Sequence, residues 1–266
     1  MSKLASFLGR IIVWGVVVLV LIYLWTPMAI DLIMSLEPGS LLRFPITGVS
    51  LRWYVFLFTT PIFLDGMKIS FSLAIVAAIL ATVLAIPSSI AFVRYKFPGK
   101  GFLTTLFTAP LATPAVVIGV ALLYFFSLLN FGFSFGNLII GHLLLTFPYA
   151  LRTITATMFG FDTSLEEASM NLGANVIETF RNITFPIISP AVIASFIFAI
   201  AVSLDDVGAT IFLVSPQTQT LNIALLGYWR WSLDPTVGAA SAFLILLGVA
   251  LTLIAERVVG LDRFLF

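Results

Sequence analysis

The sequence predicts an all-α integral membrane protein, and three observations support that prediction. Of the 266 residues, 61% are hydrophobic and only 9% are charged. A water-soluble domain cannot cover its surface with so few charges, so the expected solvent is a lipid bilayer. Six apolar stretches approach the roughly 20 residues that a helix needs to cross the hydrocarbon layer, and basic residues favour one set of connecting loops. The predicted spans are residues 11–34, 69–93, 103–129, 135–158, 187–204 and 237–259.

The first span follows Lys3 and Arg10 and begins at Ile11. A signal peptide also starts with basic residues, but its apolar segment is shorter, and no A-x-A-like cleavage site follows this one. We therefore expect the segment to be retained as a span. The sequence contains no internal repeat, low-complexity tract or second soluble region. It predicts one transmembrane domain over residues 1–266.

The placement of lysine and arginine predicts that both termini are cytoplasmic. With six spans, the termini and alternate loops share one side of the membrane, and the basic residues of a membrane protein concentrate on the cytoplasmic side. The side with the termini contains most of the 13 basic residues, with the short loop RYKFPGK after the second span as the clearest cluster. Only Arg43, Arg52, Lys68 and Arg230 fall on the other side.

Proline recurs inside the predicted spans. Each proline removes a backbone donor and tends to kink its helix. Such breaks indicate either ordinary packing irregularity or hinges beside a pathway, and Pro110 with Pro114 in the third span is the strongest case for a hinge. The prolines concerned are Pro27, Pro87, Pro110, Pro114, Pro148 and Pro190.

A polar island, residues 162–186, separates the fourth and fifth spans and reads DTSLEEASMNLGANVIETFRNITFP. Thr163 precedes Glu166 by three residues, and Ser164 precedes Glu167 by three. Both pairs fit a capping box, in which a hydroxyl side chain and a glutamate satisfy each other's backbone donors at a helix start. The island is therefore predicted to open with a short helix.

The second half of the island predicts a turn and another helix. Gly173 is placed to end the first helix in the left-handed conformation, which a residue with a β-carbon resists. Asn175 is placed to cap a second helix, with Glu178 three residues later. Pro186 is expected to begin the next span, where a missing N–H costs little. The predicted unit is helix, glycine turn, helix at the membrane surface.

The spacing of Glu167, Ala168, Gly173, Ile183 and Pro186 resembles the EAA loop of permease subunits of ATP-binding cassette importers. Ser169 and Phe185 replace the usual alanine and leucine. From about Gly66 to its end, the chain looks like the type I importer permeases. The resemblance implies six transmembrane helices and a cytoplasmic coupling helix that docks on a cytosolic ATPase. The implied coupling residues are Glu166, Glu167, Ala168, Ser169, Leu172, Gly173, Ala174, Ile183 and Pro186.

The segment Ser203-Leu204-Asp205-Asp206, with Pro216 and Thr220-Leu221 after it, resembles the spermidine and putrescine permease branch. That branch usually has Leu-Pro where this chain has Leu221-Asn222. The resemblance implies import of a polyamine or a related amine. Related branches handle aminophosphonates, opines, ferric iron, thiamine and sulfate, and these solutes stay open.

The resemblance also implies a cellular location and a set of partner proteins. It places the protein in the plasma membrane, the inner membrane of a bacterium, with a cytosolic ATPase dimer, a second permease and an external or periplasmic solute-binding protein as partners. The second permease can be an identical or a sister chain. The sequence has no G-x-x-x-x-G-K-[ST] loop, so ATP and Mg²⁺ are expected on the ATPase and no cofactor or metal on this chain. A net charge of +1 argues against a nucleic-acid partner.

Four residues are candidates for the translocation pathway. Asp205 and Asp206 follow the fifth span on its outer side, where they form either a negative patch that guides a cationic solute or a helix end that meets water. Asn130 and Tyr149 could line a pathway or simply pack between helices. The single histidine, His142, lies within the fourth span without a second titrating group nearby, which favours a packed hydrogen-bonding role over a proton relay.

Two other classes of function fit the sequence less well. A stand-alone secondary carrier or channel is the main alternative, but carriers usually show inverted repeats and intramembrane charges, whereas this sequence shows no repeat and few charges in its spans. An intramembrane protease is disfavoured: Gly48-Val49-Ser50 is followed by leucine outside a span, and one histidine cannot form H-E-x-x-H. The absence of cysteine removes thiol nucleophiles and disulfides. We therefore expect no enzymatic activity.

Overall fold

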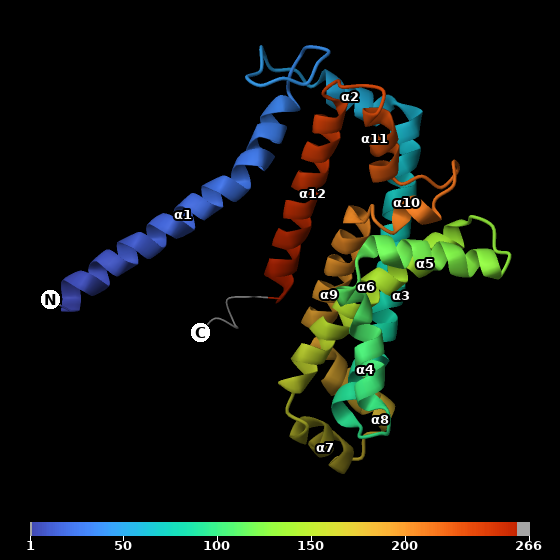
Figure 1. The fold of residues 1–266 in the computed structure, drawn as a ribbon. Coiled ribbons are helices and arrows are strands. Elements are labelled where there is room, and N and C mark those ends of the chain that lie inside the picture. Colours follow the sequence, from blue (N-terminus) through green and yellow to red (C-terminus); the bar gives the residue numbers. More distant parts are fainter. Residues whose placement is uncertain (1, 260–266) are drawn as a thin grey trace. The chain divides into compact units, whose positions relative to one another are not determined.

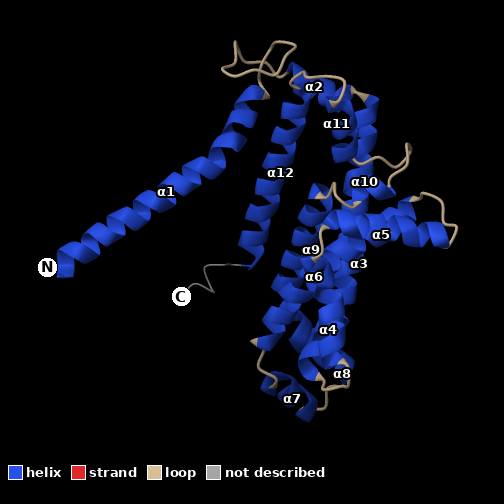
Figure 2. Ribbon diagram, viewed as in Figure 1, coloured by secondary structure: helices blue, strands red, loops and turns tan. Residues whose placement is uncertain are grey.

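The computed structural model describes residues 2–259, which form helices and connecting loops without a strand in that range (Figures 1 and 2). The all-α prediction is therefore confirmed. The chain forms two compact units, which are described separately below. One contains the residues up to Thr60 and Gly227–Leu247, and the other contains Pro61–Leu226 and the residues from Gly248 onward.

The first unit contains α1 (Ser2–Met34), α2 (Arg52–Thr59) and the beginning of α12 (Thr236–Val259). The apolar part of α1, Arg10–Met34, is long enough to span a membrane, and none of its most apolar window is buried within the structure. An isolated helix that is apolar on every side needs lipid or another protein around it. This is the first predicted span, although its helix begins earlier than the sequence indicated.

The irregular segment between α1 and α2 is organised around the carboxylate of Glu37, which is completely buried. This carboxylate accepts hydrogen bonds from the Thr47 hydroxyl at 2.6 Å, the Thr47 N–H at 2.8 Å and the Gly39 N–H at 3.0 Å. Arg43 Nε lies 3.3 Å away. The hydrogen bond from the Thr47 hydroxyl is the largest cause that lowers the pKa of Glu37 to about 2. A loop without regular structure is thereby held in one conformation.

The second unit is built on three long helices that pack side by side: α3 (Pro61–Arg94), α6 (Phe135–Phe159) and α9 (Phe185–Asp205) (Figure 1). Small residues let helix backbones approach closely, which is how helices associate in lipid. The fully buried face of α3 follows this rule. It contains five alanines at full burial, Ala74, Ala77, Ala78, Ala81 and Ala85. These three helices correspond to the second, fourth and fifth predicted spans.

The third predicted span, residues 103–129, is not one continuous helix. The structure has α4 (Lys100–Thr108), a short 3-10 helix η1 (Ala109–Ala112) and α5 (Ala115–Leu128), and the helix direction bends by 111° at the break after Ala112. Pro114 disfavours a helical conformation at Thr113, which is extended with φ −102° and ψ 129°. Within residues 2–259, five helices are thus long and apolar enough to span, or six when the bent pair counts as one span.

The other prolines inside spans leave their helices continuous. Pro27, Pro87, Pro148 and Pro190 each lie within a single helix. Ordinary packing irregularity therefore describes these four positions. Among the six prolines inside the predicted spans, all within residues 2–259, only Pro110 and Pro114 lie at the break expected of a hinge.

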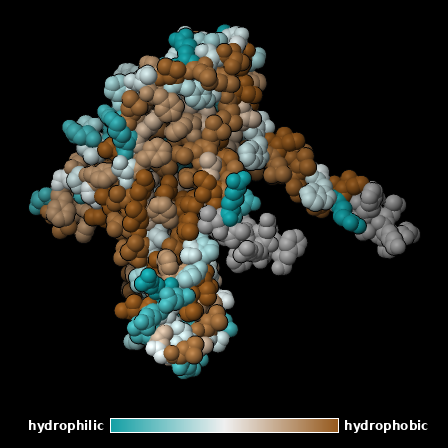
Figure 3. All heavy atoms as spheres, turned by 180° about the vertical axis from the view of Figure 1, so that it is seen from behind, coloured by the Kyte–Doolittle hydropathy of each residue, from teal (hydrophilic) through white to brown (hydrophobic). Residues whose placement is uncertain are grey.

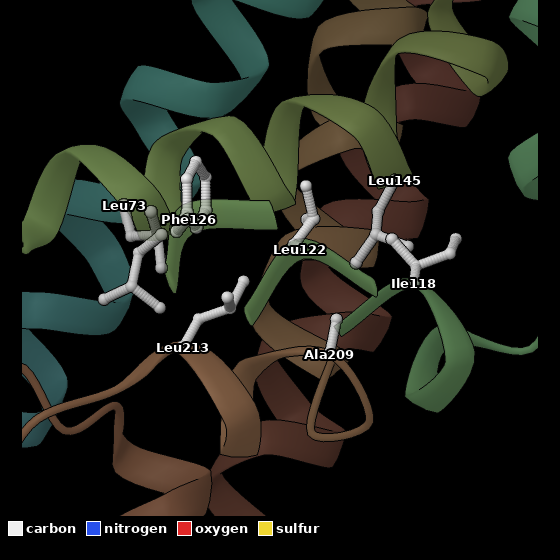
Figure 4. Packing of buried hydrophobic residues seen from close by; sticks show 8 residues of the cluster. Leu73, Ile118, Leu122, Phe126, Leu145, Ala209 and Leu213 are labelled. Carbon is white, nitrogen blue, oxygen red and sulfur yellow. The ribbon is translucent and has the colours of Figure 1, made fainter. Parts of the chain in front are cut away.

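After α9 the chain forms α10 (Thr210–Leu213) and α11 (Leu221–Trp229). Ala209 and Leu213 enter a buried cluster with Ile118, Leu122 and Phe126 of α5 (Figure 4). Gly119 permits this contact, because a β-carbon there would lie 2.7 Å from the Cα of Ala209. The bent arm α5 and the segment after α9 therefore form one tightly packed region.

Candidate functional site

The polar island folds as predicted into two short helices joined by a glycine turn. Its elements are α7 (Ser164–Asn171), α8 (Val176–Thr179) and a π-helix, η2 (Phe180–Thr184), which leads directly into α9. They lie at one end of the three-helix bundle (Figure 1). Figure 3 shows hydrophilic side chains gathered at this end, beside a surface that is mostly hydrophobic along the bundle.

Gly173 ends α7 in the left-handed conformation, with φ +95°. The Gly173 N–H donates to the Met170 carbonyl at 2.9 Å, and the Ala174 N–H donates to the Ser169 carbonyl at 3.2 Å. These two bonds form a Schellman motif, which satisfies carbonyls at the end of a helix. The prediction for Gly173 is confirmed.

The capping box predicted for the second helix is also present. Asn175 Oδ1 accepts from the Glu178 N–H, and Glu178 Oε2 accepts from the Asn175 N–H, both at 2.9 Å. Pro186 is the second residue of α9, as expected for a helix start. The glycine turn is therefore fixed on both sides by local hydrogen bonds.

The capping boxes predicted for the first helix were wrong. Thr163 has helical dihedral angles and makes no side-chain capping bond. Instead, Asp162 Oδ1 accepts from the Ser164 N–H at 3.0 Å, and hydrogen bonds from Ser164 lower the pKa of Asp162. Glu166 does not reach back to the helix start, because its carboxylate is engaged elsewhere in the fold.

Most of the predicted coupling residues lie together on or just beneath the exposed surface of this island. Glu167, Ala168 and Pro186 are exposed, and Ser169, Ala174 and Ile183 are half-buried. Ser169 and Thr179 share a hydrogen bond of 3.1 Å between their hydroxyl oxygens. Large apolar side chains stand out on both sides of the turn, with Leu172 at 90%, Val176 at 74% and Ile177 at 78% exposure. Such a patch on a polar segment suits a protein partner.

Glu166 is the predicted coupling residue that points inward. Its Oε1 lies 3.0 Å from Arg94 Nη2 at the end of α3 and accepts a 2.6 Å hydrogen bond from the Thr184 hydroxyl. The Arg94 guanidinium also lies 4.6 Å from the ring centre of Phe161. Sequence reasoning counted Arg94 only as a marker of orientation. The only signals in the sequence for this ion pair were a basic residue at the end of a span and an acidic residue in a later loop.

A cavity of about 690 Å³ lies beside this ion pair. Its walls combine apolar side chains of α3, α6, α7 and α8 with the two charged groups. The lining includes Ile90, Arg94, Met158, Glu166, Met170 and Ile177. The island is consequently not packed tightly against the helices over its whole length.

The two aspartates that follow the fifth span have different surroundings. The side chain of Asp205 is exposed and has no hydrogen-bond or ion-pair partner within residues 2–259. Asp206 Oδ2 accepts from the Thr210 hydroxyl at 2.7 Å, the Thr210 N–H at 2.9 Å and the Ala209 N–H at 3.2 Å. Asp206 therefore caps the turn that leads into α10.

His142 is buried and hydrogen-bonded at both ring nitrogens, in agreement with the packed role predicted for it. Nδ1 lies 2.7 Å from Ser203 Oγ, and Nε2 lies 3.0 Å from Thr210 Oγ1. Because the Thr210 hydroxyl donates its one proton to Asp206, we assign the imidazole proton to Nε2, and Ser203 then donates to Nδ1. A directed chain of hydrogen bonds thus runs from Ser203 through His142 and Thr210 to Asp206.

The remaining pathway candidates are not connected to these aspartates. Asn130 has a left-handed conformation, with φ +55°, and lines a cavity of about 340 Å³ with Phe126 and Asn137. Tyr149 lies on α6 and is 38% exposed. Within residues 2–259, no side-chain hydrogen bond joins Asn130 or Tyr149 to Asp205 or Asp206.

Comparisons with known proteins agree on one family. The profile described as "Binding-protein-dependent transport system inner membrane component" matches residues 81–261. The spermidine/putrescine transport system permease protein PotC of Escherichia coli (strain K12) is 27% identical over 96% of each chain. The putrescine transport system permease protein PotI of the same strain is 30% identical, covering 87% of this chain and 85% of PotI.

Solved structures show the same fold at low sequence identity. A chain of a bacterial ABC transporter involved in the import of the acidic polysaccharide alginate superimposes with a TM-score of 0.69 at 16% identity, covering 98% of this chain and 96% of that one. A chain of the MetNI methionine ABC transporter in an inward-facing conformation gives a TM-score of 0.58 at 15% identity, covering 74% of this chain and 94% of that one.

Proposed function

This chain belongs to the family of binding-protein-dependent transport system inner membrane components, and from that premise we propose that it forms half of the translocation pathway of an ATP-driven importer. It is a multi-pass permease subunit of the inner membrane and not an enzyme. The whole chain, residues 1–266, acts in this proposal as a single permease domain. A second permease, identical or related, supplies the other half.

The observation that supports coupling most strongly is the exposed turn around Gly173. Leu172, Val176 and Ile177 expose large apolar side chains within a segment that is otherwise polar, and such side chains gain free energy when a partner buries them. In the proposal, a groove on a cytosolic ATPase of the importer receives this turn. ATP and Mg²⁺ bind to that ATPase, and this chain binds neither.

The charge distribution supports the orientation that coupling requires. Arg94 and Lys100 flank the loop between α3 and α4, and Arg181 lies in the island itself. Basic loops favour the cytoplasm. We therefore place the island and both termini on the cytoplasmic side, where an ATPase can reach the turn.

The best candidate solute is a polyamine or a related amine. Both curated relatives named above carry putrescine in their names, and Asp205 offers an exposed carboxylate at the end of α9 remote from the island. A carboxylate at a pathway entrance raises the local concentration of cations. An external solute-binding protein delivers the amine in this proposal. Asn130 and Tyr149 remain candidates for the pathway lining.

Reconstitution tests the function directly. The permease is placed in proteoliposomes with its partner permease, its ATPase and its solute-binding protein, and uptake of labelled spermidine and putrescine is measured with and without ATP. Uptake that requires both ATP and the binding protein supports the proposal. Uptake by the permease alone would instead favour a secondary carrier or channel. Competition with an aminophosphonate, an opine, thiamine, ferric iron and sulfate tests the other solutes.

A further inference from the structure

We propose that Arg94 and Glu166, together with Phe161 and Thr184, form a clamp that makes the coupling helix α7 move as one body with the end of α3 and the start of α9. This inference rests on the proposed coupling to an ATPase and assigns positioning roles within it. Arg94 and Glu166 touch neither solute nor nucleotide in this proposal. They hold together the three helices through which a movement of the turn reaches the pathway.

One carboxylate oxygen joins three elements. Glu166 Oε1 of α7 lies 3.0 Å from Arg94 Nη2 of α3 and 2.6 Å from the Thr184 hydroxyl, which donates to it. Thr184 is the last residue of η2, and α9 begins at the next residue. A displacement of Glu166 therefore acts at once on the end of α3 and on the first turn of α9.

Burial makes these contacts costly to separate. The side chains of Arg94 and Glu166 are only 15% and 20% exposed. Arg94 Nη2 is buried and makes no well-aligned hydrogen bond in the described part of the chain, so the charge of Glu166 is its main compensation there. The face of the Phe161 ring, 4.6 Å from the guanidinium, stabilises the cation further. Pulling the pair apart would leave a poorly hydrated charge without its partner.

The rest of the fold does not link α7 to α3 as directly. The backbone of α7 packs mainly against α8 and η2. The cavity of about 690 Å³ lies between the island and the helices, with Arg94 and Glu166 in its wall. The charged side chains therefore bridge a region where continuous apolar packing is missing.

Neutralisation and charge exchange test the clamp. Arg94→Met, Glu166→Gln and the exchange Arg94→Glu/Glu166→Arg are reconstituted with the complete importer, and solute uptake is divided by ATP hydrolysed. Arg152→Met and Glu256→Gln change exposed residues outside the clamp and serve as matched controls. We expect each single clamp variant to lower uptake per ATP several-fold while the ATPase still co-purifies. The exchange should recover part of the loss, because it restores the ion pair but not the hydrogen bond from Thr184 or the contact with Phe161.

Unchanged uptake per ATP in Glu166→Gln, or no recovery in the charge exchange of an assembled complex, would overturn the clamp. Because the chain has no cysteine, Arg94→Cys/Glu166→Cys can be tethered selectively with a short bifunctional thiol reagent. Tethering should preserve coupled uptake relative to the untethered double variant, since the clamp stays closed throughout the cycle. Loss of uptake on tethering would contradict the clamp. If the charge variants fail to assemble, the tethering experiment is the deciding test.

Failure of the clamp can be told apart from failure of the proposed function. If the wild-type chain neither binds an ATPase nor supports ATP-dependent uptake, the coupling function itself is wrong. If the wild-type importer is coupled and the clamp variants match it, only the assignment of Arg94 and Glu166 is wrong.

Discussion

The imidazole Nε2 of His142 lies 3.0 Å from the hydroxyl oxygen of Thr210, and this contact joins the N-terminal third of α6 to the short helix α10. The same hydroxyl donates to Asp206 at 2.7 Å, so a histidine in the interior and a carboxylate at the end of α9 share one intermediary. Both His142 and Thr210 are buried. Their polar groups depend on each other in a place where water cannot replace a lost partner.

Thr210→Val should therefore destabilise the protein. The substitution preserves the shape of the side chain but removes the acceptor of the His142 N–H, and a buried polar group without a partner costs about 1–3 kcal/mol. Thr252→Val is the matched control, because Thr252 is exposed and bonds only to its own helix. Thermal unfolding of the detergent-solubilised permease measures the difference. Equal stability of the two variants would show that the contact contributes nothing.

The two aspartates should respond differently to neutralisation. Asp205→Asn should slow uptake of a cationic solute without changing stability, because its carboxylate is exposed and unpaired within the described chain. Asp206→Ala removes the acceptor for the Ala209 and Thr210 N–H groups in the turn that leads into α10, and loss of such a capping side chain costs about 0.5–2 kcal/mol. Uptake rates at fixed complex concentration, together with unfolding curves, separate the two effects. Normal uptake by Asp205→Asn would remove this residue from the pathway.

Gly173→Ala should impair docking through the backbone alone. No atom lies within 4 Å of a β-carbon at this position, but φ is +95°, and a left-handed conformation costs an L-residue about 1–2 kcal/mol. Gly173→Asn should be milder, since asparagine tolerates such angles. Co-purification of the ATPase measures docking. Gly101→Ala, in ordinary helix with equal open space, is the control.

Glu37 makes the stability of the loop between α1 and α2 depend on pH. Its pKa in the folded protein is about 2, below its ordinary value of 4.5, so ionised Glu37 stabilises the fold. This contribution is complete above pH 4.5 and is lost as the pH falls towards 2. Glu37→Gln should thus lower the unfolding temperature at neutral pH.

The difference between Glu37→Gln and the wild type should shrink as the pH falls below 4.5. Glu256→Gln, at an exposed position of α12, should show no comparable difference at either pH. Thermal unfolding at neutral and acidic pH checks both expectations. A gap between Glu37→Gln and wild type that stays constant across this range would contradict the role given to the Glu37 carboxylate.

Features set by neighbouring residues were predictable from the sequence. The apolar runs indicated the long helices, Gly173 indicated the turn, and Asn175 with Glu178 indicated the second capping box. The turn and the capping box depend on residues within about one turn of helix, and the long helices depend on continuous apolar runs, so rules of local spacing hold for all three. The capping box at Thr163 failed because Glu166 had a stronger partner outside that range. The box at Ser164 failed because Ser164 is already the first residue of α7, and its N–H donates to Asp162.

Features set by distant residues were not predictable. Arg94 and Glu166 meet only because α3 and the island end at the same place, and nothing in a single sequence encodes that meeting. Asp206 looked equivalent to Asp205 until Thr210 and His142 were placed beside it. The paired prolines Pro110 and Pro114 did indicate the break in the third span, whereas a single proline indicated none, since Pro87, Pro148 and Pro190 remain inside continuous helices.

The double fixation of the Gly173 turn affects how it recognises a partner. A helix as short as the four residues of α8 is marginal on its own, yet here one end is held by the Asn175 and Glu178 pair and the preceding end of α7 by the Schellman bonds. The turn thus loses its conformational entropy during folding of the permease itself. Association with the proposed ATPase can then proceed between preorganised surfaces, without an entropic penalty for ordering a mobile loop.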